Sequence, residues 1–330
     1  MTLAIIGAST ASLPMCSPEL DTARRFSHLG CVAGAASASP GRRLLAASGF
    51  GPAIDRGHCH AEVAAVMEAH AVALLRATAS QQRLVQDVLH CQATLLERIL
   101  ESVCLRVAHA CTSEPCRAMT IDQTGTAGVG AALFLGLHAG VASGQGLLLV
   151  TAADAWNSIF PGTFPPFVTY DHKVGALILQ KADRGRREER ERGHVLDVAC
   201  RLPSTRGPFW SSGPERARAE IAGRLVTAAE EVMTRVGWDV AVLDLLLGDP
   251  IGPDLGADLA AHLGVSPHNA PQPCGTHAGS ASLIVNIERA LAFARLKNRP
   301  AKCLLWTASA EGTVAVVALH AFPDDRTSTA

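Results

Sequence analysis

Thr126-Ala127-Gly128 opens a small apolar segment that runs into the strand-like stretch Leu147-Leu148-Leu149-Val150-Thr151-Ala152. His277-Ala278-Gly279 stands in the same way before Cys303-Leu304-Leu305-Trp306-Thr307-Ala308. This repetition predicts that the chain consists of two halves built alike. In a pseudo-symmetric protein, equivalent helix starts can meet at the centre, so we expect Thr126 and His277 to face each other across a shared cavity.

Composition and charge favour a large, well-buried globular protein. The 330 residues are 48% hydrophobic and 18% charged, which is enough to fill a substantial core. A net charge of −1 gives no electrostatic basis for binding nucleic acid, and no stretch is long and apolar enough to span a membrane. The opening residues 1–7 form a β-like run without a basic region or a cleavage site, so we expect a cytoplasmic protein.

The ten cysteines are scattered through helix-like and strand-like runs of a long chain, which is typical of reduced thiols rather than of a disulfide framework. Cys111 and Cys116, and Cys59 beside His58 and His60, suggest zinc, but no second Cys/His pair with finger-like spacing completes four ligands. The sequence therefore predicts no metal site.

Apolar periodicity predicts alternating helices and strands. Helices are expected over residues 60–78, 95–110, 128–142, 221–236 and 255–263 and from near His277. Strands are expected over residues 3–6, 85–89, 119–121, 147–152, 175–179, 240–247, 302–307 and 314–322. The charged run 181–192 is interpreted as a solvated loop between the halves, which divides the chain into domains 1–183 and 184–330. Each half is then an α/β layer structure.

Over residues 60–322, the order and spacing of these segments resemble the thiolase-fold ketosynthases, most nearly the β-ketoacyl-ACP synthase III type. The segments that carry the resemblance are Thr126-Ala127-Gly128, Leu147–Ala153 with Asp154, Tyr170–Leu179, Asp244–Gly252, His277–Ser282 and Ala308–Leu319. The resemblance implies a thiolase fold, a five-layered αβαβα arrangement of two pseudo-symmetric halves.

The chain departs from that family at all three condensing residues. Thr126 stands at the cysteine position, Asp249 at the histidine position and His277 at the asparagine position, with Thr276 the neighbour if the register shifts by one. Condensation passes through a thioester enolate that needs hydrogen-bond donors, and a carboxylate would repel its developing negative charge. Decarboxylative condensation is therefore not expected.

The three substituted residues are a hydroxyl, an imidazole and a carboxylate, which is the inventory of a nucleophilic triad. Thr126 would be the nucleophile, His277 its base and Asp249 the group that orients the base. His90, Thr276 and Thr124 are second-tier candidates for the same cavity. With the resemblance, this predicts an acyltransferase that moves an acyl group from an acyl-carrier-protein or CoA thioester to a nucleophilic acceptor without condensation, in fatty-acid or polyketide-type metabolism.

Structural alternatives stand beside this hypothesis. Thr126 suits a helix N-cap, Asp249 before Pro250 suits a turn, and His277 suits a satisfied core imidazole. The alternative function is a catalytically inactive partner subunit of a ketosynthase complex. The resemblance also implies a homodimer or a heterodimer with a related thiolase-fold subunit, no permanently bound cofactor, and a phosphopantetheine thioester as substrate carrier.

Overall fold

The computed structural model describes residues 2–12, 60–78, 85–94, 102–112, 114–122, 124–139, 146–154, 163–164, 168–182, 188, 190–203, 214–252, 254–273 and 276–323. These residues form six α-helices and a nine-stranded mixed sheet. Among the described helices, none has the length and apolarity that a membrane crossing requires.

The first half of the chain forms one arm of the sheet, with strand order β3-β2-β4-β7-β1. β2 runs parallel to β3 and β4, whereas β7 runs antiparallel to both β4 and β1. A two-stranded ladder of β5 (Thr163–Phe164) and β6 (Val168–Thr169) precedes β7. The other elements are β1 (Thr2–Ser12), α3 (His60–Ala77), β2 (Val85–Cys91), α4 (Val103–Cys111), β3 (Arg117–Ile121), the 3₁₀ turn η2 (Gly125–Ala127), α5 (Gly128–His138), β4 (Leu147–Ala153) and β7 (Lys173–Ala182).

The second half repeats this plan with strand order β8-β11-β10-β9. The described residues contain no counterpart of β3 here. Instead, Leu246 of β9 donates its N–H to the carbonyl oxygen of Asn269 at 2.7 Å, so the chain after α7 lies along this edge. The elements are β8 (Gly193–Arg201), α6 (Pro214–Val236), η4 (Val240–Val242), β9 (Leu245–Leu247), α7 (Leu255–Leu263), η5 (Gly279–Ala281), α8 (Ser282–Lys297), β10 (Ala301–Ala308) and β11 (Val314–Ala321).

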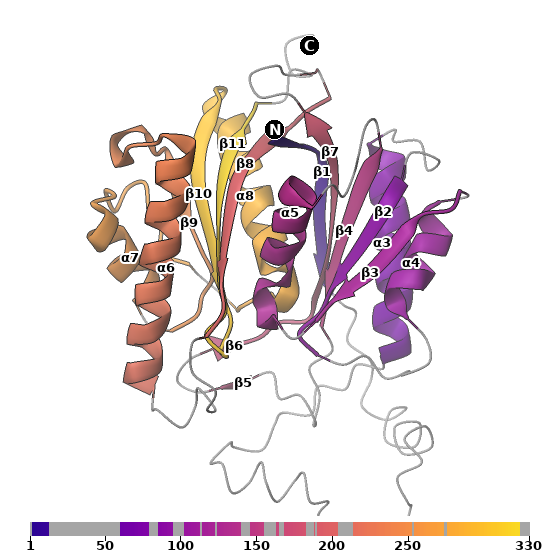
Figure 1. The fold of residues 1–330 in the computed structure, drawn as a ribbon, viewed down its shortest axis with the longest axis horizontal. Coiled ribbons are helices and arrows are strands. Elements are labelled where there is room, and N and C mark those ends of the chain that lie inside the picture. Colours follow the sequence, from indigo (N-terminus) through magenta and orange to yellow (C-terminus); the bar gives the residue numbers. More distant parts are fainter. Residues whose placement is uncertain are drawn as a thin grey trace, which may run out of the picture.

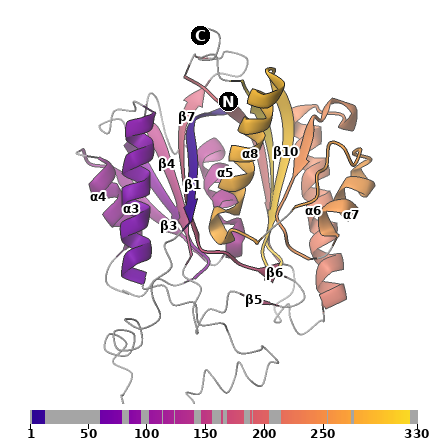
Figure 2. The same ribbon diagram turned by 180° about the vertical axis from the view of Figure 1, so that it is seen from behind.

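The two arms meet where β1 pairs antiparallel with β8, through Leu3 with Val195 and Ile5 with Gly193. Helices α5 and α8 lie between the arms, α3 and α4 cover the outer face of the first arm, and α6 and α7 cover the outer face of the second (Figure 1, Figure 2). Three separate apolar cores match these contacts, one central and two outer. The predicted five-layered αβαβα arrangement is confirmed.

Most predicted elements are present, with differences at their ends. The predicted helix over 255–263 is found at those residues, and the buried strand at 147–152 extends to Ala153. The strand predicted over 240–247 is shorter, because the Asp239 side chain accepts the N–H of Ala241 and starts a 3₁₀ turn, which leaves only Leu245–Leu247 in the sheet. Residues 95–101 of one predicted helix lie outside the described residues.

Glycines allow the central helix α5 to approach both arms of the sheet. A Cβ added at Gly130 would lie 2.3 Å from the Cβ of Ala315 on β11, and one added at Gly136 would lie 2.9 Å from side-chain atoms of Leu3 and Leu148. The central layer therefore has room for backbone but not for a further methyl group at these points.

Replacing Gly130 with alanine tests this close approach. We expect Gly130→Ala to lower the free energy of unfolding by about 1–3 kcal/mol, because the new methyl group overlaps a side chain fixed to a strand. Gly223→Ala is the matched control, since Gly223 lies in α6 with nothing within 4 Å of its added Cβ. It should raise the free energy of unfolding by about 0.5–1 kcal/mol. Urea unfolding measures both, and equal effects of the two variants would contradict the packing described.

Candidate active site

The two central helices begin alike, each after a 3₁₀ turn that starts at a glycine in the left-handed region. Gly125 has φ 54° and opens η2 before α5, whereas Gly279 has φ 58° and opens η5 before α8. By these turns, the counterpart of Thr126 is Ser280. The predicted equivalence of Thr126 with His277 is therefore wrong by three residues. That prediction aligned the two Ala-Gly pairs, whereas the glycines with left-handed backbone, Gly125 and Gly279, are the residues that occupy the same place in the two turns.

Thr126 and His277 nevertheless meet at one atom. The Thr126 side chain is buried in η2, and its Oγ1 donates to the carbonyl oxygen of Ala308 at 3.0 Å. Nε2 of His277 lies 3.1 Å from the same oxygen. Ala308 is the last residue of β10, so the end of a second-half strand joins the start of the first-half central helix to the segment before α8.

The hydrogen bonds around His277 determine which ring nitrogen carries the proton. The N–H of Gly279 donates to Nδ1 at 3.0 Å, and Oγ of Ser282 lies 2.9 Å from the same nitrogen. Because a backbone N–H can only donate, Nδ1 is the acceptor and the neutral ring carries its proton on Nε2. Nε2–H therefore faces Ala308 and also Asp249, whose Oδ2 lies 3.3 Å away.

The position of the His277 ring is fixed from its other sides. Its backbone N–H donates to Thr169 at 2.9 Å, and its carbonyl oxygen accepts from the N–H of Asp171 at 2.7 Å. The Tyr170 ring packs against the imidazole edge to face, with centroids 4.9 Å apart. His277 is fully buried in this arrangement.

Asp249 follows β9 and is a buried carboxylate that accepts hydrogen bonds from two elements and also faces His277. Asn286 of α8 donates from Nδ2 to Oδ1 at 2.9 Å, and the Thr307 hydroxyl of β10 donates to Oδ2, the oxygen that His277 also approaches. Each donor partly offsets the desolvation of the charge.

The structure thus brings Thr126, His277 and Asp249 into one buried network, with a different connectivity from the predicted triad. In a triad the base turns its lone pair to the nucleophile and receives the carboxylate on its other nitrogen. Here Asp249 and the oxygen shared with Thr126 both face Nε2–H, and the Nδ1 lone pair faces Gly279 and Ser282. In this arrangement, Nε2–H of His277 donates toward the side of the site where Thr126 lies.

The second-tier residues lie in different places. Thr276 is exposed, and it is His277 that contacts Asp249, which fixes the register left open by the sequence. Oγ1 of Thr124 lies 3.3 Å from the point that a Cβ at Gly128 would occupy, so it stands beside the first turn of α5.

His90 lies on the opposite face of the sheet from this network. Its neighbours Leu89 and Cys91 belong mainly to the central core, with Cys91 facing α5, whereas Nδ1 of His90 bonds Oγ1 of Thr151 at 3.0 Å. Thr151 alternates with Val150 and Ala152, both in the central core, so it points to the outer layer. The structure therefore does not bring His90 to the candidate site.

Asp154 also belongs to this site, although in the sequence it marks only the resemblance to the family. Asp154 follows β4 and accepts at Oδ1 from the N–H of Ala93 at 2.6 Å and of Thr94 at 3.3 Å. Ser280 donates its N–H to Oδ2 at 2.5 Å and its hydroxyl to Oδ1 at 3.0 Å. Burial raises the pKa of Asp154, and these donors act in the opposite direction. Its signal in the sequence is a carboxylate directly after a strand in which every residue but Thr151 is apolar.

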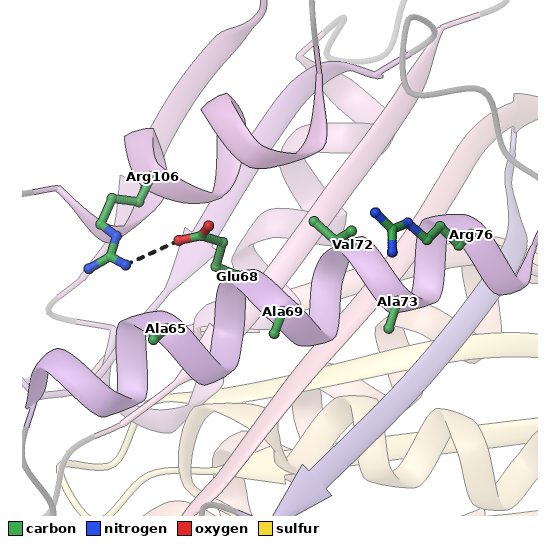
Figure 3. Close-up of a pocket in the computed structure, with 7 residues that line it drawn as sticks. All are labelled: Ala65, Glu68, Ala69, Val72, Ala73, Arg76 and Arg106. Atoms are coloured by element: carbon green, nitrogen blue, oxygen red, sulfur yellow. Dashed lines mark hydrogen bonds and ion pairs between the residues drawn. The ribbon is translucent and has the colours of Figure 1, made fainter.

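Neither a group of metal ligands nor the surface groove beside α3 coincides with this network within the described residues. Within the described ranges, no group of three His, Cys, Asp or Glu side chains could hold a metal ion. A groove of about 430 Å³ lies on α3 and α4, in the outer layer, where Arg106 pairs with Glu68 at 3.1 Å (Figure 3). Its lining residues are Ala65, Glu68, Ala69, Val72, Ala73, Arg76 and Arg106.

The buried His90 predicts a pH dependence of stability. Burial lowers its pKa to about 4 from 6.5, although hydrogen bonding with the Gln92 side chain acts in the opposite direction. The unfolded chain therefore binds a proton first, and stability falls as the pH drops below 6.5. Between pH 7 and pH 5 we expect a loss of about 2 kcal/mol from this group.

Urea unfolding at the two pH values measures this loss. His90→Asn should remove about 2 kcal/mol of the difference between them. His268→Asn, at an exposed histidine, is the control and should leave the difference unchanged. An identical pH dependence in His90→Asn and the wild type would contradict the buried, neutral state of His90.

Comparison with known proteins supports the architecture. No protein-family model and no curated protein matches the chain. Among solved structures, ChlB3, described as an acyltransferase, has a TM-score of 0.71 at 14% identity and covers 98% of this chain and 99% of its own. AbyA1, a tetronic acid condensing enzyme, has a TM-score of 0.63 at 18% identity, covering 97% and 100%.

The 3-oxoacyl-(acyl carrier protein) synthase III, FabH, from Pseudomonas aeruginosa PAO1 has a TM-score of 0.65 at 14% identity, covering 98% of this chain and 99% of its own. These proteins and the present chain share one architecture over nearly their whole lengths, as the sequence resemblance implied. The chain therefore has the thiolase fold found in the β-ketoacyl-ACP synthase III type.

Proposed function

We propose that this protein is a non-condensing acyltransferase that takes an acyl group from an acyl-carrier-protein or CoA thioester and passes it to a nucleophilic acceptor. The observation that supports this most strongly is the meeting of the Thr126 hydroxyl and His277 Nε2–H at the Ala308 oxygen, at the starts of two central helices. The structural likeness to ChlB3, described as an acyltransferase, is consistent with it.

Asp249 argues against condensation as the reaction. A condensing site stabilises an enolate oxygen with donors, and a buried carboxylate next to His277 Nε2 would oppose that charge. Acyl transfer has no such intermediate. Its tetrahedral oxyanion needs donors only near the attacked carbonyl, and the first turn of α5, at the positive end of that helix's dipole, follows Thr126 closely in the chain.

The proposed reaction has two balanced steps. Oγ1 of Thr126 attacks the thioester carbonyl, the C–S bond breaks, and the thiol leaves with the proton that the threonine lost. The acceptor then attacks the threonine ester, its proton passes to the site, and Thr126 recovers its hydroxyl. Water as the acceptor would make the protein a thioesterase.

The proton transfer requires a rearrangement of His277. To accept the Thr126 proton, Nε2 must lose its own proton, and Nδ1 must carry it instead. Nδ1 would then donate to the Ser282 hydroxyl, which can rotate from donor to acceptor, while the Gly279 N–H is released. Substrate binding would also have to break the bond from Thr126 to Ala308.

Partners follow from the same proposal. The donor is a phosphopantetheine thioester, with no permanently bound cofactor, and the second subunit is an identical or related thiolase-fold chain. Strand β3 forms one edge of the described sheet, and its Met119 is 51% exposed, which suits pairing with another subunit.

A second candidate function has an observation of its own. Both ring nitrogens of His277 are engaged and Thr126 is only 1% exposed, which is also what a satisfied, non-reacting core would show. The protein would then be the inactive partner of a ketosynthase-like subunit that bears a nucleophilic cysteine.

Intact mass spectrometry distinguishes these functions. The purified chain is incubated with a panel of acyl-CoA and acyl-carrier thioesters, together with Thr126→Ala and His277→Ala. We expect an acyl adduct on the wild type that is absent from Thr126→Ala and forms about a hundredfold or more slowly in His277→Ala. Thr2→Ala is the matched control, because Thr2 is also a buried threonine whose hydroxyl donates to a carbonyl oxygen, that of Ala182. It should keep the adduct.

Two outcomes of this experiment would contradict the proposed acyltransferase mechanism. No adduct and no loss of thioester across the panel, together with a stable complex between this chain and a cysteine-bearing homologue, would replace the acyltransferase by the inactive partner. An adduct that persists in Thr126→Ala would place the nucleophile elsewhere.

A further inference from the structure

Asp154, in the first half of the chain, binds the turn before α8, in the second half. We call its hydrogen bonds with Ser280 the Asp154 tether. Asp154 follows β4, and its two oxygens accept both the N–H and the hydroxyl of Ser280, in the turn η5 before α8. The same carboxylate accepts the N–H groups of Ala93 and Thr94, directly after β2. Four donors from two segments thus meet on one side chain that is 2% exposed.

This tether lies one residue from the donor that orients His277. Ser280 gives its N–H to Asp154, and its neighbour Gly279 gives its N–H to Nδ1 of His277. Gly279 has φ 58°, in the left-handed region, and the Ala281 N–H closes the turn on the carbonyl oxygen of Ala278 at 3.1 Å. Holding Ser280 in place therefore fixes the direction of the Gly279 N–H.

The direction of that N–H decides the state of the imidazole. While Gly279 donates to Nδ1, the neutral ring must carry its proton on Nε2, toward Ala308 and Asp249. If the turn relaxed, Nδ1 could take up a proton and donate to Ser282.

We propose that Asp154 is a positioning residue that acts through Ser280 and Gly279 to hold His277 as the Nε2–H tautomer. It does not touch the reacting atoms. Its effect on the tautomer is independent of the proposed function, whereas its effect on acyl transfer rests on that function.

The ¹⁵N chemical shifts of the His277 ring test the proposal, because they report which nitrogen carries the proton. The wild type should show a protonated Nε2 and an unprotonated Nδ1. Asp154→Asn has nearly the same shape but only one acceptor oxygen, so its amide group faces a donor and the turn loosens. We expect Nδ1 to gain a proton in most molecules of this variant.

Ser280→Ala is a milder variant and removes one of the four donors. It should give a smaller but measurable fraction of Nδ1 protonation. The control is Asp87→Asn, which removes another buried carboxylate, one that pairs with Arg117 in the first half. It should destabilise the protein without changing the His277 shifts. Wild-type His277 shifts in folded Asp154→Asn, or in folded Ser280→Ala if the former does not fold, would overturn the proposal.

Acylation gives a second, separable readout. If Thr126 is acylated, Asp154→Asn should speed adduct formation severalfold, because the Nδ1–H tautomer that the proton transfer requires is then already populated, with half-saturation at an unchanged thioester concentration. A raised half-saturation concentration with an unchanged maximal rate would contradict a positioning role. If the ring shifts change as expected while the wild type forms no adduct, the tether stands and the acyltransferase function fails.

Discussion

The carbonyl oxygen of Ala308 is the atom on which the arrangement of the candidate site depends. It accepts from Thr126 at the start of one central helix and from His277 before the other. Both helices lie between two sheet arms that exclude water, so every polar group at their starts needs a partner within the protein. The buried side chains of Asp249, Asn286 and Thr307 complete this requirement around the imidazole.

The two-fold repetition of the fold explains why such a site exists, and its imperfections determine the chemistry there. Each half places a left-handed glycine and a small polar residue before its central helix, Thr126 in one and Ser280 in the other. The hydroxyl of Thr126 binds a backbone oxygen, whereas that of Ser280 binds a carboxylate. The Thr126 hydroxyl is therefore held by a single neutral acceptor, whereas the Ser280 hydroxyl is held by a carboxylate that also accepts the Ser280 N–H.

Much of the fold and of the candidate site could be predicted from the sequence. The rest depends on backbone geometry, which residue types alone do not determine. Apolar periodicity located the helices and strands, and the three departures from the condensing residues pointed to Thr126, Asp249 and His277, which the fold brings together. The pairing of the helix starts was missed because backbone φ, not residue similarity, defines the turns. His90 was misplaced because a shift of one residue in a strand exchanges the two faces of a sheet. The direction of His277's lone pair depends on the N–H of Gly279, which no side-chain pattern records.

A crystal structure with an acyl-CoA analogue, in which a methylene group replaces the thioester sulfur, tests the central claim that this network is an acyl-thioester site. The analogue keeps the carbonyl group but cannot transfer its acyl chain. We predict its carbonyl carbon against Oγ1 of Thr126, with the hydrogen bond from Thr126 to Ala308 broken and the His277 ring released from Gly279. A structure with no analogue beside Thr126, and with both residues still bonded to the Ala308 oxygen, would contradict the account and identify the network as a structural core.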